Sequence, residues 1–437
     1  MILRLYQTLT TLAGLLGWPY FYWHLKHRGR GESFLPRLGI KLPPPPPPGR
    51  PRIWLHGVSV GEILAAQPLF QELKRLLPQA GFIITTGTET GQAVARKNYT
   101  SQGAQVCYFP LDLPWAVARY LDHLRPDLFV ALDSEIWPNF LTQARSRGVR
   151  LALVNARLSD ASFGRYVKYR RYLIDILNNI ELLSAGSQQD YERFRSLGLP
   201  PGKLHLTGNL KIDRLLESQK TDNMEEFRFL MQGTEEPATA PVFLAASTHP
   251  GEEEAVLEAY QNLRSPYPAL LLLLAPRHPE RTPELGRLLN SRGLPLQLWS
   301  RLKSGQESRR ASVVLIDTVG DLFSLYGLAD VAFVGGSLVP HGGQNLLEPA
   351  AWGLVPIYGP HINNFRWAQA ILESAQAGIM IQDAPSLTAA LRDLLDHPDQ
   401  ARVQGQRARD ALTPHQGAAR RQAELILRLC EVRGQLK

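Results

Sequence analysis

Short apolar runs alternate with amphipathic stretches along most of the chain. One series of runs lies between residues 53 and 154: Ile53–Leu55, Phe82–Thr86, Val106–Phe109, Leu128–Leu132 and Leu151–Val154. A second series lies between residues 242 and 358: Val242–Ala245, Leu270–Leu274, Val313–Ile316, Val331–Val334 and Val355–Tyr358. Stretches between them, such as Ile63–Leu77, have helical periodicity. The alternation predicts parallel strands crossed by helices. We therefore expect an α/β protein with two doubly wound units in tandem, for which 437 residues are sufficient.

Changes in composition divide the chain further. Six consecutive prolines, Pro43 to Pro48, predict a stiff polyproline spacer. The region from Thr207 to Pro241, rich in Glu, Gln and Thr, predicts a junction, and the residues from His415 to about Gly434 predict one basic amphipathic helix. The expected division is an anchoring segment at 1–30, a Pro-rich linker at 31–51, a first domain at 52–210, a second linker at 211–240, a second domain at 241–414 and a helix at 415–437.

The first thirty residues predict attachment to a membrane. Between Leu5 and Trp23 the chain carries no charge, but glycines and a proline interrupt the apolar residues, so the segment is marginal as a span of about 20 residues. The cations Lys26, Arg28 and Arg30 follow it and predict that the next domain stays on the cytoplasmic side. We expect a span or an in-plane helix; the alternative is an apolar helix docked on the protein itself.

The charge balance narrows the class of partner. The formal net charge is +8 and the isoelectric point is about 9.5, which favours nucleic acid, phospholipid headgroups, or phosphorylated and carboxylated substrates. Charge alone does not choose among them. The two cysteines, Cys107 and Cys430, stand far apart, so neither a disulfide framework nor a zinc site is indicated.

In open α/β sheets ligands bind at the carboxyl ends of the strands, and in the first half acidic residues stand there. Glu62 follows the first strand, three residues after Ser59, and its carboxylate is placed to accept a proton from an attacking hydroxyl. The alternative is that Glu62 only complements the helix dipole. The fourth strand ends in Asp133, Ser134 and Glu135, with capping of the next helix by Asp133 or Ser134 as the alternative.

Two cations complete the pattern of the first half. Arg157 follows the fifth strand, and Lys211 stands in the junction. Both are candidates to meet anionic groups of a substrate. Their alternative is an ordinary place on the surface, which is common for single cations.

The second half has the pattern of a phosphate site. Hydroxyl residues and glycines follow two of its strands, and they are Ser247, Thr248, Gly336 and Ser337. Glycines allow backbone amides to approach a phosphate, and a helix that starts near Asn345 offers its positive end to an anion. Glu348, one turn further on, is placed to accept hydrogen bonds from ribose hydroxyls.

Several other functions are excluded by missing motifs. The chain has no GxxxxGK[ST] run and its first strand-to-helix turn lacks GxGxxG, so a P-loop enzyme and a dinucleotide dehydrogenase are not expected. His249 and His278 form no HxxxH pair and the carboxylates form no DxD pattern, so no catalytic metal and no cofactor are expected. Arg277 and helix-start amides would then stabilise a departing phosphate.

Taken in order, the motifs resemble those of a known family, the 3-deoxy-D-manno-octulosonic acid (Kdo) transferases of the lipopolysaccharide inner core. The segments that carry the resemblance are HGVSVGE (56–62), SEIWPN (134–139), NARLS (155–159), GNLKID (208–213), ASTHPGEE (246–253), APRHPER (275–281), GGSLVPHGGQNLLEPAA (335–351) and GPHINNF (359–365). They span the body of the chain, and together they are highly specific. The apolar segment Leu5–Trp23 matches the family's N-terminal anchor.

The resemblance implies a GT-B fold, with two Rossmann-like domains facing a central cleft. It implies an inverting, metal-independent transfer of Kdo from cytidine monophosphate-Kdo (CMP-Kdo) to a lipid A precursor at the cytoplasmic face of the inner membrane, with no nucleic acid partner. Glu62 matches the proton acceptor, and Glu135 and Lys211 match positions that stabilise the transition state. The residues implied to hold the cytidylate are Pro276, Arg277, Thr318, Val319, Gly320, Asn345, Leu346, Leu347 and Glu348. Further substrate contacts are expected from Ser59, Arg157, Ser247, Thr248, Gly336 and Ser337.

The chain departs from the family pattern near the expected nucleotide site. Gln344 and Leu346 stand where the family usually has His and often has Pro. Gln donates a hydrogen bond but carries neither a proton nor a positive charge, so the leaving group would be stabilised differently. Two alternatives follow: a GT-B transferase that uses a uridine diphosphate sugar on another lipid, and a membrane-attached nucleotide-sugar binding protein without catalysis.

Overall fold

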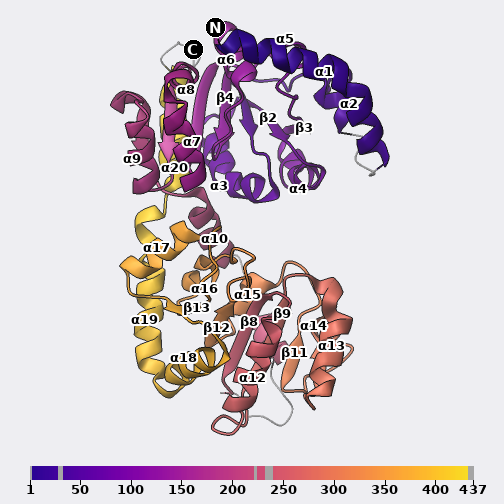
Figure 1. The fold of residues 1–437 in the computed structure, drawn as a ribbon, viewed down its shortest axis with the longest axis vertical. Helices are drawn as coiled ribbons and strands as arrows, with labels where there is room; N and C mark the ends of the chain where they lie inside the picture. Colours follow the sequence, from indigo (N-terminus) through magenta and orange to yellow (C-terminus); the bar gives the residue numbers. More distant parts are fainter. Residues whose placement is uncertain (1, 28–32, 221–223, 232–239, 432–437) are drawn as a thin grey trace. The chain divides into compact units, whose positions relative to one another are not determined.

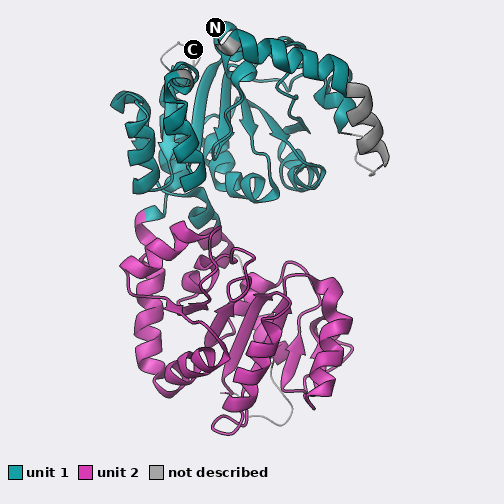
Figure 2. Cartoon of the chain, viewed as in Figure 1, with its two compact units in different colours: residues 1–214, 415–437 teal, residues 215–414 magenta. Residues whose placement is uncertain are grey.

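The structure is a computed structural model that describes residues 2–27, 33–220, 224–231 and 240–431. The chain forms two compact units (Figure 2). The first unit comprises residues 1–214 and 415–437, and the second unit comprises residues 215–414. That the two units face a central cleft stays a prediction.

A parallel sheet of seven strands forms the centre of the first unit (Figure 1). The strand order is β3-β2-β1-β4-β5-β6-β7, with bounds β1 Arg52–His56, β2 Gly81–Thr86, β3 Gln105–Tyr108, β4 Leu128–Leu132, β5 Arg150–Ala156, β6 Leu182–Ala185 and β7 Leu204–Leu206. All five strands that the apolar runs predict are confirmed. The sequence did not indicate β6 and β7, because these runs are short and contain none of the β-branched residues that favour strands.

The helices of the first unit connect these strands. Their bounds are α1 Ile2–His27, α2 Phe34–Arg37, α3 Val60–Leu76, α4 Glu89–Tyr99, α5 Pro114–Leu124, α6 Pro138–Ser146, α7 Asp160–Lys168, α8 Arg170–Leu177, α9 Gln188–Ser196, α10 Leu210–Lys220 and α20 Ala418–Glu431. Several begin at a hydroxyl residue, such as Ser59 or Thr88, whose oxygen accepts a backbone N–H of the first turn. Such caps fix where each helix leaves its strand.

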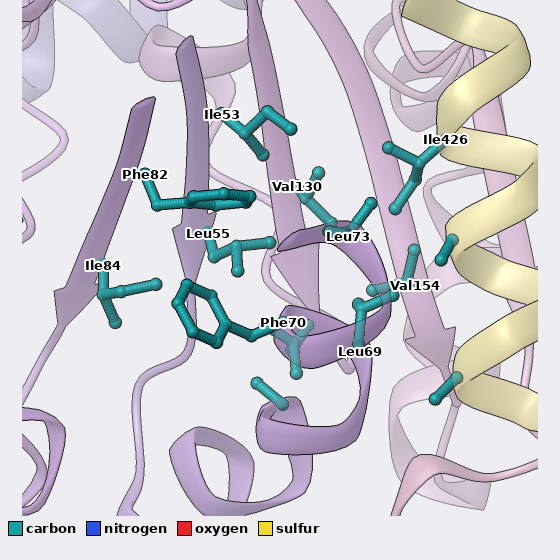
Figure 3. Packing of buried hydrophobic residues seen from close by; sticks show 14 of the residues in the cluster. Ile53, Leu55, Leu69, Phe70, Leu73, Phe82, Ile84, Val130, Val154 and Ile426 are labelled. Atoms are coloured by element: carbon teal, nitrogen blue, oxygen red, sulfur yellow. The ribbon is translucent and has the colours of Figure 1, made fainter. Parts of the chain in front are cut away.

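The C-terminal helix α20 is part of the core of the first unit. Ile426 of α20 belongs to one buried cluster with Ile53 and Val154 of the sheet and with Leu73 of α3, and Figure 3 shows it on the side of Val154 and Leu73. The Asp213 carboxylate accepts the Gly417 and Ala419 N–H groups, each at 2.6 Å, and so caps the start of α20. The predicted C-terminal helix is therefore present, and it packs on the first unit, whose other residues are 1–214.

A second parallel sheet of seven strands forms the second unit. Its order is β10-β11-β9-β8-β12-β13-β14, with bounds β8 Val242–Thr248, β9 Leu271–Pro276, β10 Leu296–Leu298, β11 Val313–Leu315, β12 Val331–Val334, β13 Pro356–Tyr358 and β14 Ile379–Met380. Its helices are α11 Met224–Met231, α12 Glu253–Leu263, α13 Thr282–Ser291, α14 Trp299–Lys303, α15 Leu322–Tyr326, α16 Leu347–Ala351, α17 Arg366–Ser374, α18 Ala384–Asp396 and α19 Pro398–Asp410. Two doubly wound α/β units in tandem are thus confirmed.

The two expected linkers contain more structure than their composition suggests. The proline run lies on the first unit, where the Gln105 side chain donates to the Pro44 carbonyl at 2.8 Å and His123 lies 2.9 Å from that of Pro43. It is packed against the body rather than standing apart from it as a spacer. In the second linker, α10 and α11 occupy much of residues 211–240, of which 221–223 and 232–239 lie outside the described residues.

Helix α1 contains the expected anchor. In the described part of the chain, none of the helices combines the length and the apolar character of a membrane span. Tyr6, Thr10 and Gly14 face the first unit, whereas Leu5, Leu9 and Leu16 are 56, 56 and 79% exposed. The helix therefore docks on the protein through small and polar residues and turns its leucines outward. Arg28 and Arg30 of the predicted cation cluster lie outside the described residues.

Candidate active site

The predicted acidic site residues of the first unit lie at the point in the sheet where the strand order reverses. Strands β1 and β4 are neighbours, but the chain leaves β1 toward β2 on one side and β4 toward β5 on the other. Such a switch point is where open α/β sheets bind ligands. Glu62 follows β1, and Asp133 and Glu135 follow β4.

Glu62 is held by the residues that begin α3. Its carboxylate accepts the Val58 N–H and the Ser59 hydroxyl, both at 2.7 Å, while Ser59 caps the helix. Burial and the nearby charge of Asp133 raise the pKa of Glu62, and the two hydrogen bonds oppose that rise. Both interpretations of Glu62 therefore agree with the geometry: the carboxylate completes the helix start, and its raised pKa makes it a better proton acceptor.

Glu135 is the most perturbed carboxylate of this group. Its pKa is raised to about 7, first by burial and then by the charges of Glu62 and Asp133. The charge of Glu62 is thus among the causes that raise the pKa of Glu135. A carboxyl group with a pKa near neutrality can either hold or release a proton under physiological conditions.

Asp133 joins the two predicted cations, a connection that the sequence did not indicate. It is 6% exposed, and one carboxylate oxygen lies 3.1 Å from Arg157 Nε and 3.4 Å from Lys211 Nζ. Its other oxygen accepts the Asn155 side-chain amide at 2.6 Å. Asp133 and Asn155 both have positive φ angles, 57° and 53°, which turn these side chains at the strand ends. Arg157 and Lys211 are therefore both held by Asp133, and their contact with a substrate stays a prediction.

The capping alternative for Asp133 and Ser134 is wrong. Helix α6 begins at Pro138, and the first N–H groups of the helix are accepted by Asp112, which comes from the loop before α5. The Ser134 hydroxyl instead donates to the Arg157 carbonyl. The spacing of acidic residues before a helix could not show that a residue distant in sequence serves as the cap.

A second switch point lies between β8 and β12 in the second unit. Ser247 and Thr248 end β8, and Gly335, Gly336 and Ser337 follow β12. A Cβ at Gly335 would lie 2.5 Å from the Ser247 carbonyl oxygen, so only glycine lets the two strand ends approach this closely. The structure therefore brings these four predicted residues, Ser247, Thr248, Gly336 and Ser337, together.

The amides of this glycine loop are already bonded to a carboxylate. Glu252 is fully buried and accepts the N–H groups of Gly336 at 2.7 Å, Ser337 at 2.9 Å and Leu338 at 2.8 Å, as well as that of His249. The expectation that amides of Gly336 and Ser337 receive a phosphate is not supported, because Glu252 holds them. Gly336 and Ser337 would have to contact a nucleotide-sugar substrate through atoms other than these backbone amides.

His249 lies directly beside the loop. It is 8% exposed, and its Nε2 makes no hydrogen bond with any described residue. Its ring stacks on His341 with centroids 4.2 Å apart, and a Cβ at Gly336 would meet both the His249 ring and the Gln344 amide. Burial, followed by the neighbouring His341, lowers the pKa of His249 to about 4, so its imidazole is neutral at physiological pH.

The remaining predicted residues of the second unit follow nearby strands. Arg277 follows Pro276 at the end of β9. Its side chain is exposed, and its backbone N–H donates to the Thr248 carbonyl at 2.9 Å. Thr318, Val319 and Gly320 form the loop after β11, with Val319 88% exposed.

The segment from Asn345 to Glu348 opens α16, a helix of only five residues. The Asn345 side chain accepts the Leu347 N–H at 3.2 Å and donates to the Glu348 carboxylate at 3.2 Å, while Leu346 is buried. The Leu347 amide is thus bonded to Asn345, and the expected helix start is short. Within the described residues, no group of three or more His, Cys, Asp or Glu side chains is arranged to hold a metal ion.

The sequence and the fold are similar to those of known proteins. A family model described as 3-deoxy-D-manno-octulosonic-acid transferase (kdotransferase) matches residues 32–214. The chain is 34% identical to the 3-deoxy-D-manno-octulosonic acid transferase of Haemophilus influenzae over 87% of each protein. It is also 34% identical to that of Bordetella pertussis, over 91% of this chain and 92% of the relative. Among solved structures, UDP-GlcNAc 2-epimerase from Neisseria meningitidis bound to UDP-GlcNAc has a TM-score of 0.61 at 14% identity, covers 86% of this chain and 100% of that one, and shows the likeness of fold alone.

Proposed function

The chain belongs to the 3-deoxy-D-manno-octulosonic acid transferase family and is a glycosyltransferase with a GT-B-like fold, and from this premise we propose its reaction. We propose that it transfers Kdo from CMP-Kdo to a lipid A precursor in lipopolysaccharide synthesis, with inversion and without a metal or other cofactor. The observation that carries the proposal is the group of carboxylates and cations at the β1/β4 switch point, because it supplies a base beside two cations held in place.

The proposed reaction is one displacement. The acceptor oxygen forms a bond to the anomeric carbon of Kdo on the face opposite the phosphate. The bond from that carbon to the phosphate oxygen breaks, cytidylate leaves with the electron pair, and the acceptor proton moves to Glu62. The raised pKa of Glu62 favours this transfer.

Arg157 and Lys211 supply positive charge for the anionic groups of the reactants. Asp133 fixes both cations from one oxygen, and 42% of the Arg157 side chain and 28% of the Lys211 side chain remain exposed, so their outer atoms can contact a substrate. Cations that are already oriented need no reorganisation when charge develops in the transition state. Glu135, whose pKa is about 7, stabilises the transition state beside them.

The second unit is proposed to hold the nucleotide. Arg277 is exposed at the end of β9 and is suited to the phosphate, and Glu348, oriented by Asn345, is suited to ribose hydroxyls. Thr318, Val319 and Gly320 would contact the cytosine base of the nucleotide. Gln344, beside Gly336 and His249, would donate a hydrogen bond where the family usually places an imidazole.

Helix α1 is proposed to attach the protein to the cytoplasmic face of the inner membrane as an in-plane helix. Its exposed leucines form an apolar face, and the net charge of +8 favours an anionic lipid surface. In this arrangement the lipid A precursor is a neighbour of the enzyme in the same membrane.

The proposal is tested by the mass of the product. Purified protein is incubated with CMP-Kdo and a lipid A precursor, and we expect the lipid to gain the mass of Kdo residues. Titration calorimetry with cytidylate and uridylate runs in parallel, and we expect binding of cytidylate alone. Preference for uridylate would favour a different sugar donor, whereas nucleotide binding without any mass gain would favour a binding protein without catalysis.

A further inference from the structure

The inner face of α1 is fixed against the first unit by a close contact. A Cβ at Gly14 would lie 2.4 Å from the Trp115 ring, so the α1 backbone packs directly on this side chain of α5. A side chain at this position would have to displace the end of the Trp115 ring. Helix α1 is thus a fitted part of the first unit in addition to carrying exposed leucines.

Asp112 links α1 to the loop that carries Glu135. The Asp112 carboxylate is 8% exposed and accepts the Asn139 N–H at 3.1 Å and the Phe140 N–H at 2.8 Å, the first donors of α6. It also accepts the Tyr6 hydroxyl of α1 at 3.0 Å. One buried carboxylate therefore caps α6 and receives a hydrogen bond from α1.

Asn139 provides a second connection to the same helix. It is fully buried, and its side-chain amide donates to the Asp112 carbonyl at 2.5 Å and to the Thr10 hydroxyl of α1 at 3.2 Å. Glu135 lies in the loop between β4 and α6, just before Asn139 in the first turn of α6. The two contacts from α1, through Tyr6 and Thr10, thus meet at the end of the loop that orients Glu135.

We propose that α1 holds the loop of residues 133–139 in its catalytic position, with Asp112 as the positioning residue. Because the other face of α1 carries the exposed leucines, attachment of that face to lipid and order in the catalytic loop are linked through one helix. The inference rests on the proposed function for its catalytic meaning. The alternative is that these hydrogen bonds only fasten α1 to the unit. Both Asp112 carboxylate oxygens accept hydrogen bonds and the buried Asn139 amide donates two, while Asn139 Oδ1 accepts none from the described residues. Bonded polar groups in a buried network favour one arrangement, which supports the positioning role.

The test removes the two polar contacts and preserves shape. In the double variant Tyr6→Phe with Thr10→Val, the ring, the helix and all the leucines remain. The matched control is Thr8→Val, because the Thr8 hydroxyl bonds only to the Arg4 carbonyl within α1. Thr10→Ser keeps the hydroxyl and serves as the conservative rescue. The readouts are hydrogen exchange at the Asn139 and Phe140 amides, kcat and donor KM for Kdo transfer, and binding to vesicles with anionic lipid.

In the double variant we expect exchange of these two amides to become at least about tenfold faster and kcat to fall at least about tenfold, as the loss of one hydrogen bond to a carboxylate and one neutral hydrogen bond predicts. Donor KM and vesicle binding should not change, because the proposed donor residues and the leucines are intact. Thr8→Val and Thr10→Ser should match the wild type. Unchanged exchange, or faster exchange with an unchanged kcat, would overturn the positioning role. Failure of the wild type to transfer Kdo would count against the proposed function alone, while the exchange arm would still decide the link to α1.

Discussion

Three carboxylates lie at the ends of β1 and β4, and their surroundings give them different chemistry. Glu62 accepts two hydrogen bonds from the start of α3, Asp133 is paired with two cations, and burial raises the pKa of Glu135 to about 7. Separation of pKa values by environment is how one site holds both proton acceptors and fixed charges. The residue types were predictable from the sequence, but their division of labour depends on contacts between different strand ends.

The raised pKa of Glu135 predicts an effect on stability with a definite sign. The folded protein binds this proton more tightly than the unfolded chain, whose ordinary pKa is 4.5, so stability from this group is lost as pH rises from 4.5 through about 7. Glu135→Gln should therefore raise the free energy of unfolding at about pH 8 by about 1 kcal/mol, after allowance for solvent screening. At about pH 5 the substitution should have little effect. Urea unfolding at both pH values checks this, and an equal effect at the two would contradict it.

The cation pair predicts the effect of neutralising Asp133. In Asp133→Asn the side chain would lose its charge and keep one acceptor oxygen for the Asn155 amide and the two cations, so Arg157 and Lys211 would be held less firmly. We expect kcat for Kdo transfer to fall by roughly 10²-fold, the scale of losing one electrostatic contribution in an active site. The control is Asp122→Asn, which removes a surface ion pair with Arg147. Equal kcat values in the two variants would argue against the role of Asp133.

At the scale of elements, the apolar runs predicted most strands, including the edge strand β3, and missed β6, β7, β10 and β14. Strands β10 and β14 have only three and two residues, too short for a periodic signal. The links between elements were also out of reach. Asp112 caps α6 from 27 residues away, and Asp213 caps α20 across 204 residues. Sequence spacing predicts local caps, whereas these depend on the tertiary fold.

Because Glu252 accepts backbone N–H groups of the loop after β12, we expect it to contribute more to stability than the neighbouring glutamates. Glu252→Gln would leave one oxygen to accept four N–H groups and would turn an amide toward some of them. We expect a loss of about 3 kcal/mol in the free energy of unfolding, together with weaker binding of the nucleotide. Glu254→Gln, an exposed neighbour on α12, is the control and should match the wild type. Denaturant unfolding and calorimetry measure both effects, and wild-type stability in Glu252→Gln would refute the expectation.

At the scale of the whole molecule, the fold class and the family followed from ordered motifs, but the unit that the C-terminal helix joins did not. The first unit includes α20 because Ile426 packs with Ile53 and Val154, and no local pattern shows which unit a terminal helix joins. Likewise, the candidate residues were identified one by one, but the contact of Asp133 with both Arg157 and Lys211 depends on how the fold brings the ends of β4 and β5 to the start of α10.

The central claim is that Glu62 is the base of a Kdo transfer, and single-turnover transfer of Kdo tests it most directly. The variant is Glu62→Gln, and the matched control is Glu72→Gln, which lies on the same helix α3 in a surface pair with Arg75. We predict that Glu62→Gln lowers the rate by about 10³-fold, within the range of general base catalysis, while cytidylate binding stays intact and Glu72→Gln matches the wild type. A Glu62→Gln enzyme that transfers Kdo at the wild-type rate would contradict the account.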